Sequence, residues 1–164
     1  MMASDTDVVV CEVGLRDGLQ SITHFFPTEE KISWLQAEAA IGMPSIEVTS
    51  FVPPKLIPQF CDATEMVHAG LAIPGLEVVA LTPNQKGAER GIELGVHTLN
   101  FVMSVSRTHN LKNVRRERED SIAEFARIVE RVRELPEGQR PKLVAGMGTA
   151  LGCSYEGRIA ISEV

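Results

Sequence analysis

The sequence predicts an α/β protein built on parallel strands, and three observations carry that prediction. Short runs of β-branched and apolar residues alternate along the chain with longer amphipathic segments, as in repeated strand–helix units. Glycine, proline and helix-capping residues stand at the boundaries between these segments. The 164 residues are 44% apolar and 23% charged, the composition of an ordinary globular domain, and by length we expect a single domain.

The first half of the chain contains three predicted strands. Residues 7–13, 45–49 and 76–81 are rich in β-branched and apolar side chains. A helix is expected between the first two strands, because Thr28 can cap its start and Gly42 can end it in the left-handed conformation.

The connections in this half are expected to be a long loop, a rigid loop and a short helix. Residues 14–26 lack helical periodicity, and residues 51–60 contain three prolines. The spacing of Asp62 and Glu65 is that of a capping box, which predicts a short helix ending near Gly70.

The second half continues the same alternation. A helix is predicted to start around Pro83 and to end at Gly95, and strands are predicted at 97–102 and 142–146. Between those strands lies the clearest helical face of the chain, formed by Ile122, Phe125, Ile128, Val129 and Val132. Residues 156–164 are expected to begin one more helix.

Two architectures fit this alternation, a doubly wound open sheet and a (β/α)8 barrel. A dinucleotide-binding open sheet would place G-x-G-x-x-G after the first strand, and the sequence GLRDGLQ at 14–20 lacks that spacing. A (β/α)8 barrel typically takes about 250 residues. Periodicity alone therefore predicts either a five-stranded open sheet or the first five-eighths of a barrel.

Composition excludes several functional classes. The net charge is −6, from 22 acidic and 16 basic residues, so a nucleic-acid surface is not expected. No stretch approaches ~20 uninterrupted apolar residues, which argues against a membrane span. The acidic first seven residues do not resemble a signal or transit peptide. The three cysteines are scattered and odd in number, which fits a reducing compartment, and we expect a cytoplasmic protein.

Polar side chains gather just beyond the predicted strand ends. They are Arg16, Asp17, Gln20, Glu47, Thr49, Ser50, Thr82, Asn84, Ser104, Ser106, Thr149 and Cys153. The carboxyl ends of parallel strands share one face, and ligands bind at that face in both candidate architectures. We therefore expect the functional site there.

Arg16 and Asp17 carry the most informative chemistry. A carboxylate is a hard oxygen ligand for Mg²⁺ or Mn²⁺, and a guanidinium can stabilise a developing enolate or oxyanion. The same two residues could equally form an ordinary turn salt bridge. Glu12 and Glu47 lie inside apolar strands, where a carboxylate is costly unless paired. They could orient Arg16, touch a polar substrate, or point outward at a strand end.

Other reactive side chains give weaker signals. The four histidines lack the spacing of metal ligands, so no histidine metal site is expected. Cys153 lies in a glycine-rich loop and could be a nucleophile. A structural role is favoured, because no histidine stands near it in the sequence.

Five segments together resemble the 3-hydroxy-3-methylglutaryl-CoA lyase family. They are EVGLRDGLQ (12–20), IEVTSFVPPK (46–55), LTPNQKG (81–87), KNV (112–114) and ALGCSYEG (150–157). Each segment alone is a weak signal, but five in order with similar spacing identify the family. The resemblance covers the chain from about Val8 to its last residue.

The resemblance implies a (β/α)8 TIM barrel. Residues 1–164 would be the N-terminal part of one catalytic domain, about the first five βα units, truncated in the helix after the fifth strand. The unpaired outer edges of such a partial barrel favour association, so a homo-oligomer, a dimer, is expected.

The implied activity is a metal-dependent carbon–carbon lyase. It would cleave 3-hydroxy-3-methylglutaryl-CoA or a related 3-hydroxyacyl-CoA to acetyl-CoA and a ketoacid, with Mg²⁺ or Mn²⁺ as the divalent cation. Carried onto matching positions, Asp17 is implied as a metal ligand and Arg16 as the catalytic group that stabilises the enolate. Glu47 is implied as a carboxylate that orients Arg16 or handles a proton. Substrate-binding positions are implied at Arg16, Gln20, Asn84 and Ser106.

Three positions depart from the family pattern. Leu15 and Ser154 stand where these lyases usually have proline, and Arg107 replaces an acidic residue. The metal-binding histidines and the catalytic-cysteine loop of the family are not among these 164 residues, so the chain alone is expected to be inactive. The alternatives are a Claisen-condensing acyltransferase or ketoacid aldolase of the same superfamily, and a non-catalytic half-barrel fragment.

Overall fold

The structure is a computed structural model that describes residues 8–164. Residue 7, where the first predicted strand begins, and the acidic N-terminal segment that does not resemble a leader lie outside the described residues. The chain consists of two compact units, one up to Ala80 and one from Leu81. The expectation of a single domain stays a prediction.

The strands confirm the predicted partial TIM barrel. They are β1 (Cys11–Glu12), β2 (Ser45–Ser50), β3 (Glu77–Thr82), β4 (Thr98–Ser104) and β5 (Lys142–Gly148). They hydrogen-bond in the sequential order β1-β2-β3-β4-β5, and β1 pairs with β2, and β4 with β5, in parallel. A doubly wound sheet would place the first strand inside the sheet instead of at its edge.

Helices and short turns alternate with the strands. The helices are α1 (Thr28–Ala40), α2 (Ala63–Leu71), α3 (Gln85–Leu94), α4 (Arg107–Val114) and α5 (Arg118–Arg133). The short turns are η1 (Gly14–Gly18), η2 (Pro58–Phe60), η3 (Glu137–Gln139) and η4 (Ile161–Glu163). Across residues 8–164, no helix combines the length and the apolar character that crossing a bilayer requires.

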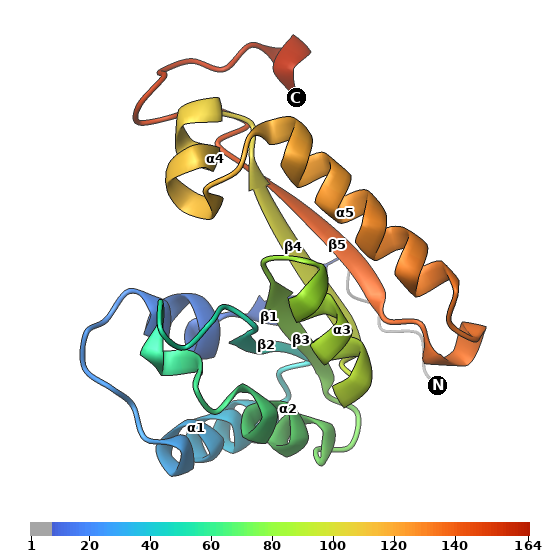
Figure 1. The fold of residues 1–164 in the computed structure, drawn as a ribbon. Coiled ribbons are helices and arrows are strands. Elements are labelled where there is room, and N and C mark those ends of the chain that lie inside the picture. Colours follow the sequence, from blue (N-terminus) through green and yellow to red (C-terminus); the bar gives the residue numbers. More distant parts are fainter. Residues whose placement is uncertain (1–7) are drawn as a thin grey trace. The chain divides into compact units, whose positions relative to one another are not determined.

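In the first unit, α1 and α2 lie side by side (Figure 1). Every residue of β2 is buried. Leu35 of α1 and Met66 of α2 are core residues. A Cβ added to Gly70 of α2 would lie 3.4 Å from the side chain of Val48, so α2 packs closely on the apolar face of β2. Because side chains alternate along a strand, Glu47 and Thr49 belong to the other face of β2.

β1 is much shorter than the predicted strand at 7–13. Only Cys11 and Glu12 pair with β2, opposite Ser45 and Ile46. The preceding valines, residues 8–10, are exposed. Their β-branched side chains favour a strand, but β2 begins at Ser45, so these valines have no residues of β2 to pair with.

The starts of α1 and α2 differ from the predicted caps. Thr28 is the first helical residue after Pro27, and its hydroxyl donates to Oδ2 of Asp62 at 2.8 Å. Asp62 makes no side-chain cap bond, because its carboxylate accepts from the buried ammonium of Lys31. A charged donor is a stronger partner for a carboxylate than a backbone amide, so the predicted capping box does not form. Gly42 follows α1 with φ of 90°, as expected for the end of that helix.

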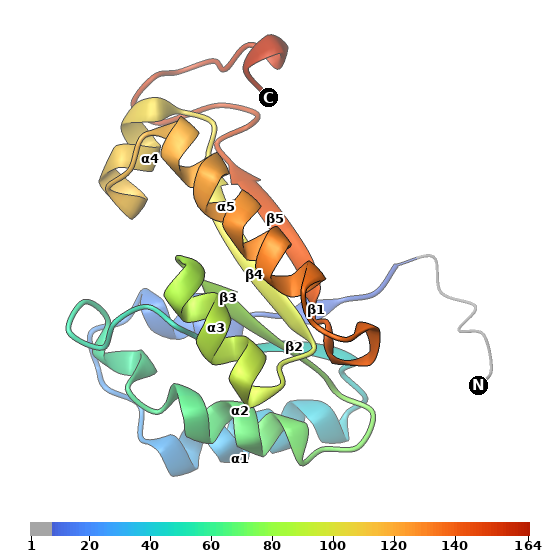
Figure 2. The same ribbon diagram turned by 45° about the vertical axis from the view of Figure 1, so that its right-hand side comes forward.

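In the second unit, α5 runs along β4 and β5 (Figure 2). Ile128 is buried, and Phe125 stacks on Phe101 of β4 with ring centroids 5.2 Å apart. The spacing of Ile122 predicts that it shares this buried face, but its side chain is exposed. The first turn of α5 instead buries Ser121, whose hydroxyl accepts from the Asn110 side chain at 2.9 Å.

Two further features of the second unit differ from the sequence-based expectations. α4 was not predicted, because its residues, RTHNLKNV, have no apolar periodicity. Residues 156–164 do not begin an α-helix and contain only the single turn η4. Ile161 in that turn is exposed, and a short helix without a packed apolar face is marginal in water.

Candidate active site

The candidate site is built on η1, the turn that follows β1. The carbonyl of Val13 accepts hydrogen bonds from the amides of Arg16 at 3.1 Å, Asp17 at 2.7 Å and Gly18 at 3.4 Å. The bond from Gly18 spans five residues and closes a π-helical turn, where the sequence predicts a loop. Leu15 is buried and anchors the turn in the core. The turn therefore holds the backbone of both charged residues in place.

A close approach of two side chains fixes the start of this turn. Oε1 of Glu12 accepts from the amide of Gly14 at 2.5 Å. A Cβ added to Gly14 would lie 2.8 Å from that oxygen and 2.8 Å from the ring of Trp34, so glycine is required there. The sequence left three roles open for Glu12: orienting Arg16, contacting a polar substrate, or pointing outward at a strand end. The structure shows a different role, because the Glu12 carboxylate binds the backbone of the turn that follows it.

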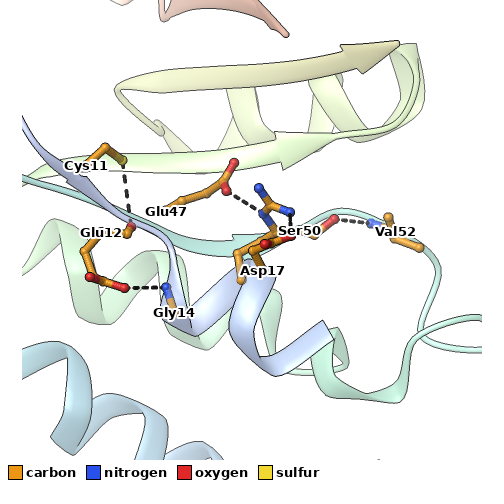
Figure 3. Close-up of polar contacts among 8 residues, drawn as sticks. Cys11, Glu12, Gly14, Asp17, Glu47, Ser50 and Val52 are labelled. Carbon is orange, nitrogen blue, oxygen red and sulfur yellow. Dashed lines mark hydrogen bonds and ion pairs between the residues drawn. The ribbon is translucent and has the colours of Figure 1, made fainter. Parts of the chain in front are cut away.

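The central contact of the site is an ion pair between Arg16 and Glu47, 31 residues apart in sequence (Figure 3). Nε of Arg16 donates to Oε2 of Glu47, and Nη1 donates to Oδ1 of Asp17 at 2.7 Å. The exposed fraction of the side chain is 1% for Glu47, 13% for Arg16 and 64% for Asp17. The buried carboxylate therefore orients the guanidinium, while Asp17 stays open to solvent.

The guanidinium has capacity for one more anionic partner. Its Nε and Nη1 are occupied, and within the described residues its Nη2 has no acceptor. Two carboxylates hold its plane, so little reorganisation is needed when an oxyanion binds. Such a group can stabilise negative charge that develops on a substrate oxygen.

Asp17 has the chemistry of one ligand for a hard cation. Its carboxylate is exposed, and Arg16 contacts only one of its two oxygens. Mg²⁺ is usually bound through one or two carboxylates together with water and substrate oxygens. Residues 8–164 contain no group of three or more His, Cys, Asp or Glu side chains placed to hold a metal. The Asp17 carboxylate fits a cation such as Mg²⁺, but the described residues alone do not supply a complete set of metal ligands.

Of the other predicted binding residues, Asn84 and Ser106 have local roles in the structure. Gln20 is exposed and follows η1. In the second unit, Oδ1 of Asn84 accepts from the amide of Gly87 at 2.9 Å and caps α3. Ser106 caps α4 in the same way, accepting from the amide of His109 at 3.1 Å. Substrate binding by Gln20, Asn84 and Ser106 stays a prediction.

Cys153 belongs to a hydrogen-bonded loop in the second unit. Its Sγ lies 3.0 Å from Oγ of Ser106 and accepts from the amide of Tyr155 at 3.3 Å. Desolvation disfavours the thiolate, but hydrogen bonds from Ser106, then from the amides of Tyr155 and Glu156, bring the pKa of Cys153 below its ordinary value. The thiol is buried, which agrees with the structural role that the sequence favours.

A buried polar network in the first unit was missed by sequence analysis. Nζ of Lys31 donates to both carboxylate oxygens of Asp62 and to the carbonyl of Gln59. The Gln59 side chain in turn accepts from the amide of Phe26 at 3.1 Å and donates to the carbonyl of His24 at 2.5 Å. This network ties the loop between η1 and α1 to η2. Its only sequence signal is the position of Lys31, one helical turn before the core residue Leu35.

Comparison with known proteins gives a consistent result. A family model described as HMGL-like matches residues 7–164. Curated relatives include a hydroxymethylglutaryl-CoA lyase of Bacillus subtilis, 37% identical over 159 residues, which cover 96% of this chain and 51% of that protein. The mitochondrial hydroxymethylglutaryl-CoA lyase of Mus musculus is 34% identical over 157 residues, covering 96% of this chain and 47% of the relative.

Solved structures agree with the sequence relatives. An HMG-CoA lyase from Acinetobacter baumannii, in complex with coenzyme A and 3-methylmalate, matches with a TM-score of 0.84 and 38% identity, over 94% of this chain and 49% of that one. The Bacillus subtilis HMG-CoA lyase matches with a TM-score of 0.87 and 34% identity, over 95% and 51%. The chain thus spans about half the length of the proteins it matches.

Proposed function

The chain belongs to the HMGL-like family, and from this premise we propose that Arg16, Glu47 and Asp17 serve a lyase that cleaves a carbon–carbon bond in a 3-hydroxyacyl-CoA. The observation that carries the proposal is the ion pair between Arg16 and the buried carboxylate of Glu47, beside the exposed Asp17. The names of the relatives make 3-hydroxy-3-methylglutaryl-CoA the first substrate to test. The products would be acetyl-CoA and a ketoacid.

The proposed reaction is a reverse Claisen-type cleavage. A base removes the proton of the 3-hydroxyl group, and its oxygen then forms a carbonyl with C3. The bond between C2 and C3 breaks, and its electron pair becomes the enolate of the acetyl thioester, which afterwards takes up a proton at C2. Nη2 of Arg16 is the donor for the enolate oxygen, and Glu47 keeps the guanidinium plane in position.

A divalent cation, Mg²⁺ or Mn²⁺, is part of the proposal. When bound, such a cation polarises the substrate oxygens that it contacts. Asp17 would supply one carboxylate oxygen to it. The hydrogen bond between Asp17 and Arg16 would then fix the position of the cation ligand relative to the oxyanion donor.

Replacing Arg16 by lysine tests the role of the guanidinium. Lysine keeps the positive charge but lacks the planar fork, so it cannot contact Glu47 and a substrate oxygen together. We expect kcat to fall about 10²-fold or more at saturating metal, the scale of losing one oxyanion donor, while metal affinity stays nearly unchanged. The assay measures acyl-CoA cleavage by the full-length protein as the cell produces it. Wild-type turnover by Arg16→Lys would mean that Arg16 only supports the turn.

Replacing Asp17 by asparagine tests the metal ligand separately. The change removes a formal charge from a hard-cation site, so Mg²⁺ or Mn²⁺ titrations should show weaker binding. Matched controls are Arg131→Lys, in a surface ion pair with Glu89, and Asp120→Asn, at an exposed position of α5. Both controls should titrate and turn over like the wild type. An unchanged metal titration for Asp17→Asn would remove Asp17 from the proposed site.

A cytoplasmic location and a dimer also remain proposals. Curated relatives include a cytoplasmic lyase of Homo sapiens as well as mitochondrial lyases, so the family occupies more than one compartment. Fractionation of the source cells tests the location, and light scattering tests the dimer. A sharp monomeric peak would contradict the dimer.

A further inference from the structure

Several hydroxyl groups lie near the ends of the strands, and they differ in whether they have a hydrogen-bond partner. Most of them are engaged by the protein itself. Oγ1 of Thr82 donates to the carbonyl of Asn84 at 2.8 Å, and Oγ of Ser104 lies 2.7 Å from Nδ1 of His109. Oγ of Ser50 accepts from the amide of Val52 at 3.2 Å (Figure 3). These hydroxyls therefore have structural roles.

Thr49 differs from the others. Its exposed fraction is 1%, and among the described residues its Oγ1 is buried without any hydrogen-bond partner. Buried polar groups in folded proteins are almost always hydrogen-bonded, and an unpaired one lowers stability. Valine has nearly the shape of threonine without the hydroxyl, so the fold by itself gives no reason for a hydroxyl at this position.

The position of Thr49 relates it to the candidate site. It follows Glu47 by two residues on β2, so both side chains belong to the same face of the strand. Glu47 on that face holds Arg16, whereas Val48 packs toward α2 on the opposite face. The unpaired hydroxyl therefore lies on the side of β2 that carries the oxyanion donor.

We propose that Thr49 binds substrate by donating a hydrogen bond from Oγ1 to an oxygen of the 3-hydroxyacyl group. The inference rests on the proposed function and adds one contact to it. Residues two apart on a strand are separated by about 7 Å. Arg16, held at Glu47, and Thr49 therefore contact different oxygens of one ligand. The substrate class is an acyl thioester with a second oxygen group several bonds away, such as a carboxylate.

Stability measurements test the unpaired hydroxyl without reference to activity. Thr49→Val and Thr82→Val remove the same group from two buried positions, and within the described part of the chain only the Thr82 hydroxyl has a partner. We expect Thr82→Val to lower the melting temperature and Thr49→Val to leave it unchanged or raise it. Equal losses in both variants would mean that Thr49 has a structural partner, and the inference would be overturned.

Kinetics test the contact with substrate. Thr49→Val should raise KM for the acyl-CoA about tenfold with kcat changed less than threefold, since a lost positioning bond weakens binding. Thr49→Ser keeps the hydroxyl and should stay within threefold of the wild-type KM. An unchanged KM in Thr49→Val overturns the inference, and so does a Thr49→Ser variant as impaired as Thr49→Val.

A binding titration separates this inference from the proposed function. The probe is 3-hydroxy-3-methylglutarate, which has the acyl oxygens but lacks the thioester that stabilises the enolate formed when the C2–C3 bond breaks. If the wild type binds it, Thr49→Val binds it less tightly, and no acyl-CoA is cleaved, then the proposed reaction fails and the Thr49 contact stands. If the wild type cleaves acyl-CoA and Thr49→Val behaves identically, only the Thr49 contact fails. If the wild type neither binds the probe nor cleaves acyl-CoA, both the proposed function and the Thr49 contact are overturned.

Discussion

Replacing Lys31 by methionine should destabilise the first unit strongly, because it breaks a buried ion pair. Nζ of Lys31, on a side chain that is 2% exposed, donates to Oδ2 of Asp62 at 2.9 Å, to Oδ1 at 3.1 Å and to the carbonyl of Gln59 at 2.5 Å. Without the ammonium, the buried Asp62 carboxylate keeps one side-chain partner among residues 8–164, the hydroxyl of Thr28 at 2.8 Å.

The structure sets the size of this effect. Methionine fills much of the space of the lysine stem, so the loss comes mainly from the uncompensated charge and not from a cavity. Removing one partner of a buried ion pair typically costs about 3–5 kcal/mol. We expect the free energy of unfolding to fall by about 3 kcal/mol or more. The double variant Lys31→Met/Asp62→Leu should recover most of that loss, because apolar replacement of both partners is often neutral.

The assay is urea unfolding followed by the fluorescence of Trp34, the single tryptophan, which lies in α1 with its ring edge-on to Phe26. The amide of Phe26 donates to Gln59 of the network. Lys86→Met, at an exposed position of α3, is the matched control and should change the free energy of unfolding by less than about 0.5 kcal/mol. A loss below about 1 kcal/mol in Lys31→Met, or a double variant no more stable than the single one, would refute the reasoning.

Two further predictions concern η1 and α1. Gly14→Ala should lower the free energy of unfolding by about 1–3 kcal/mol, because the added Cβ meets Glu12 and Trp34 at 2.8 Å. Gly18→Ala, which meets no atom within 4 Å, should be nearly neutral, and equal thermal shifts would contradict the packing argument. Burial raises the pKa of Glu38, opposed by its hydrogen bond from Trp34 and assisted by the charge of Glu12. The wild type therefore loses stability as the pH rises above the ordinary glutamate value of about 4.3 and through the raised pKa, whereas Glu38→Gln does not titrate. The melting temperature of Glu38→Gln minus that of the wild type should therefore increase between pH 4 and 7. A difference that stays constant over this range would show that Glu38 titrates normally.

Local features of the sequence were sufficient to predict the alternation of strands and helices. Gly42 and Gly95 end their helices with φ of 90° and 79°, because glycine adopts the left-handed conformation without steric cost. Arg16 and Asp17 are adjacent, so their ion pair could be expected from the sequence as an ordinary turn contact. The family resemblance, which favoured the barrel over the open sheet, also depends on short segments whose order is visible in the sequence.

Only the tertiary structure decided which partners distant residues have. The sequence left three roles open for Glu47, and its ion pair with Arg16 depends on the pairing of β1 with β2. Lys31 looks like a solvated helix residue until α1 packs against α2 and brings it to Asp62. The hydroxyl of Thr49 is one of several at strand ends, and its lack of a partner among residues 8–164 becomes visible only when its neighbours in space are known. Backbone conformation depends mainly on adjacent residues, whereas the burial and pairing of a charge or hydroxyl depend on elements that are far apart in the chain.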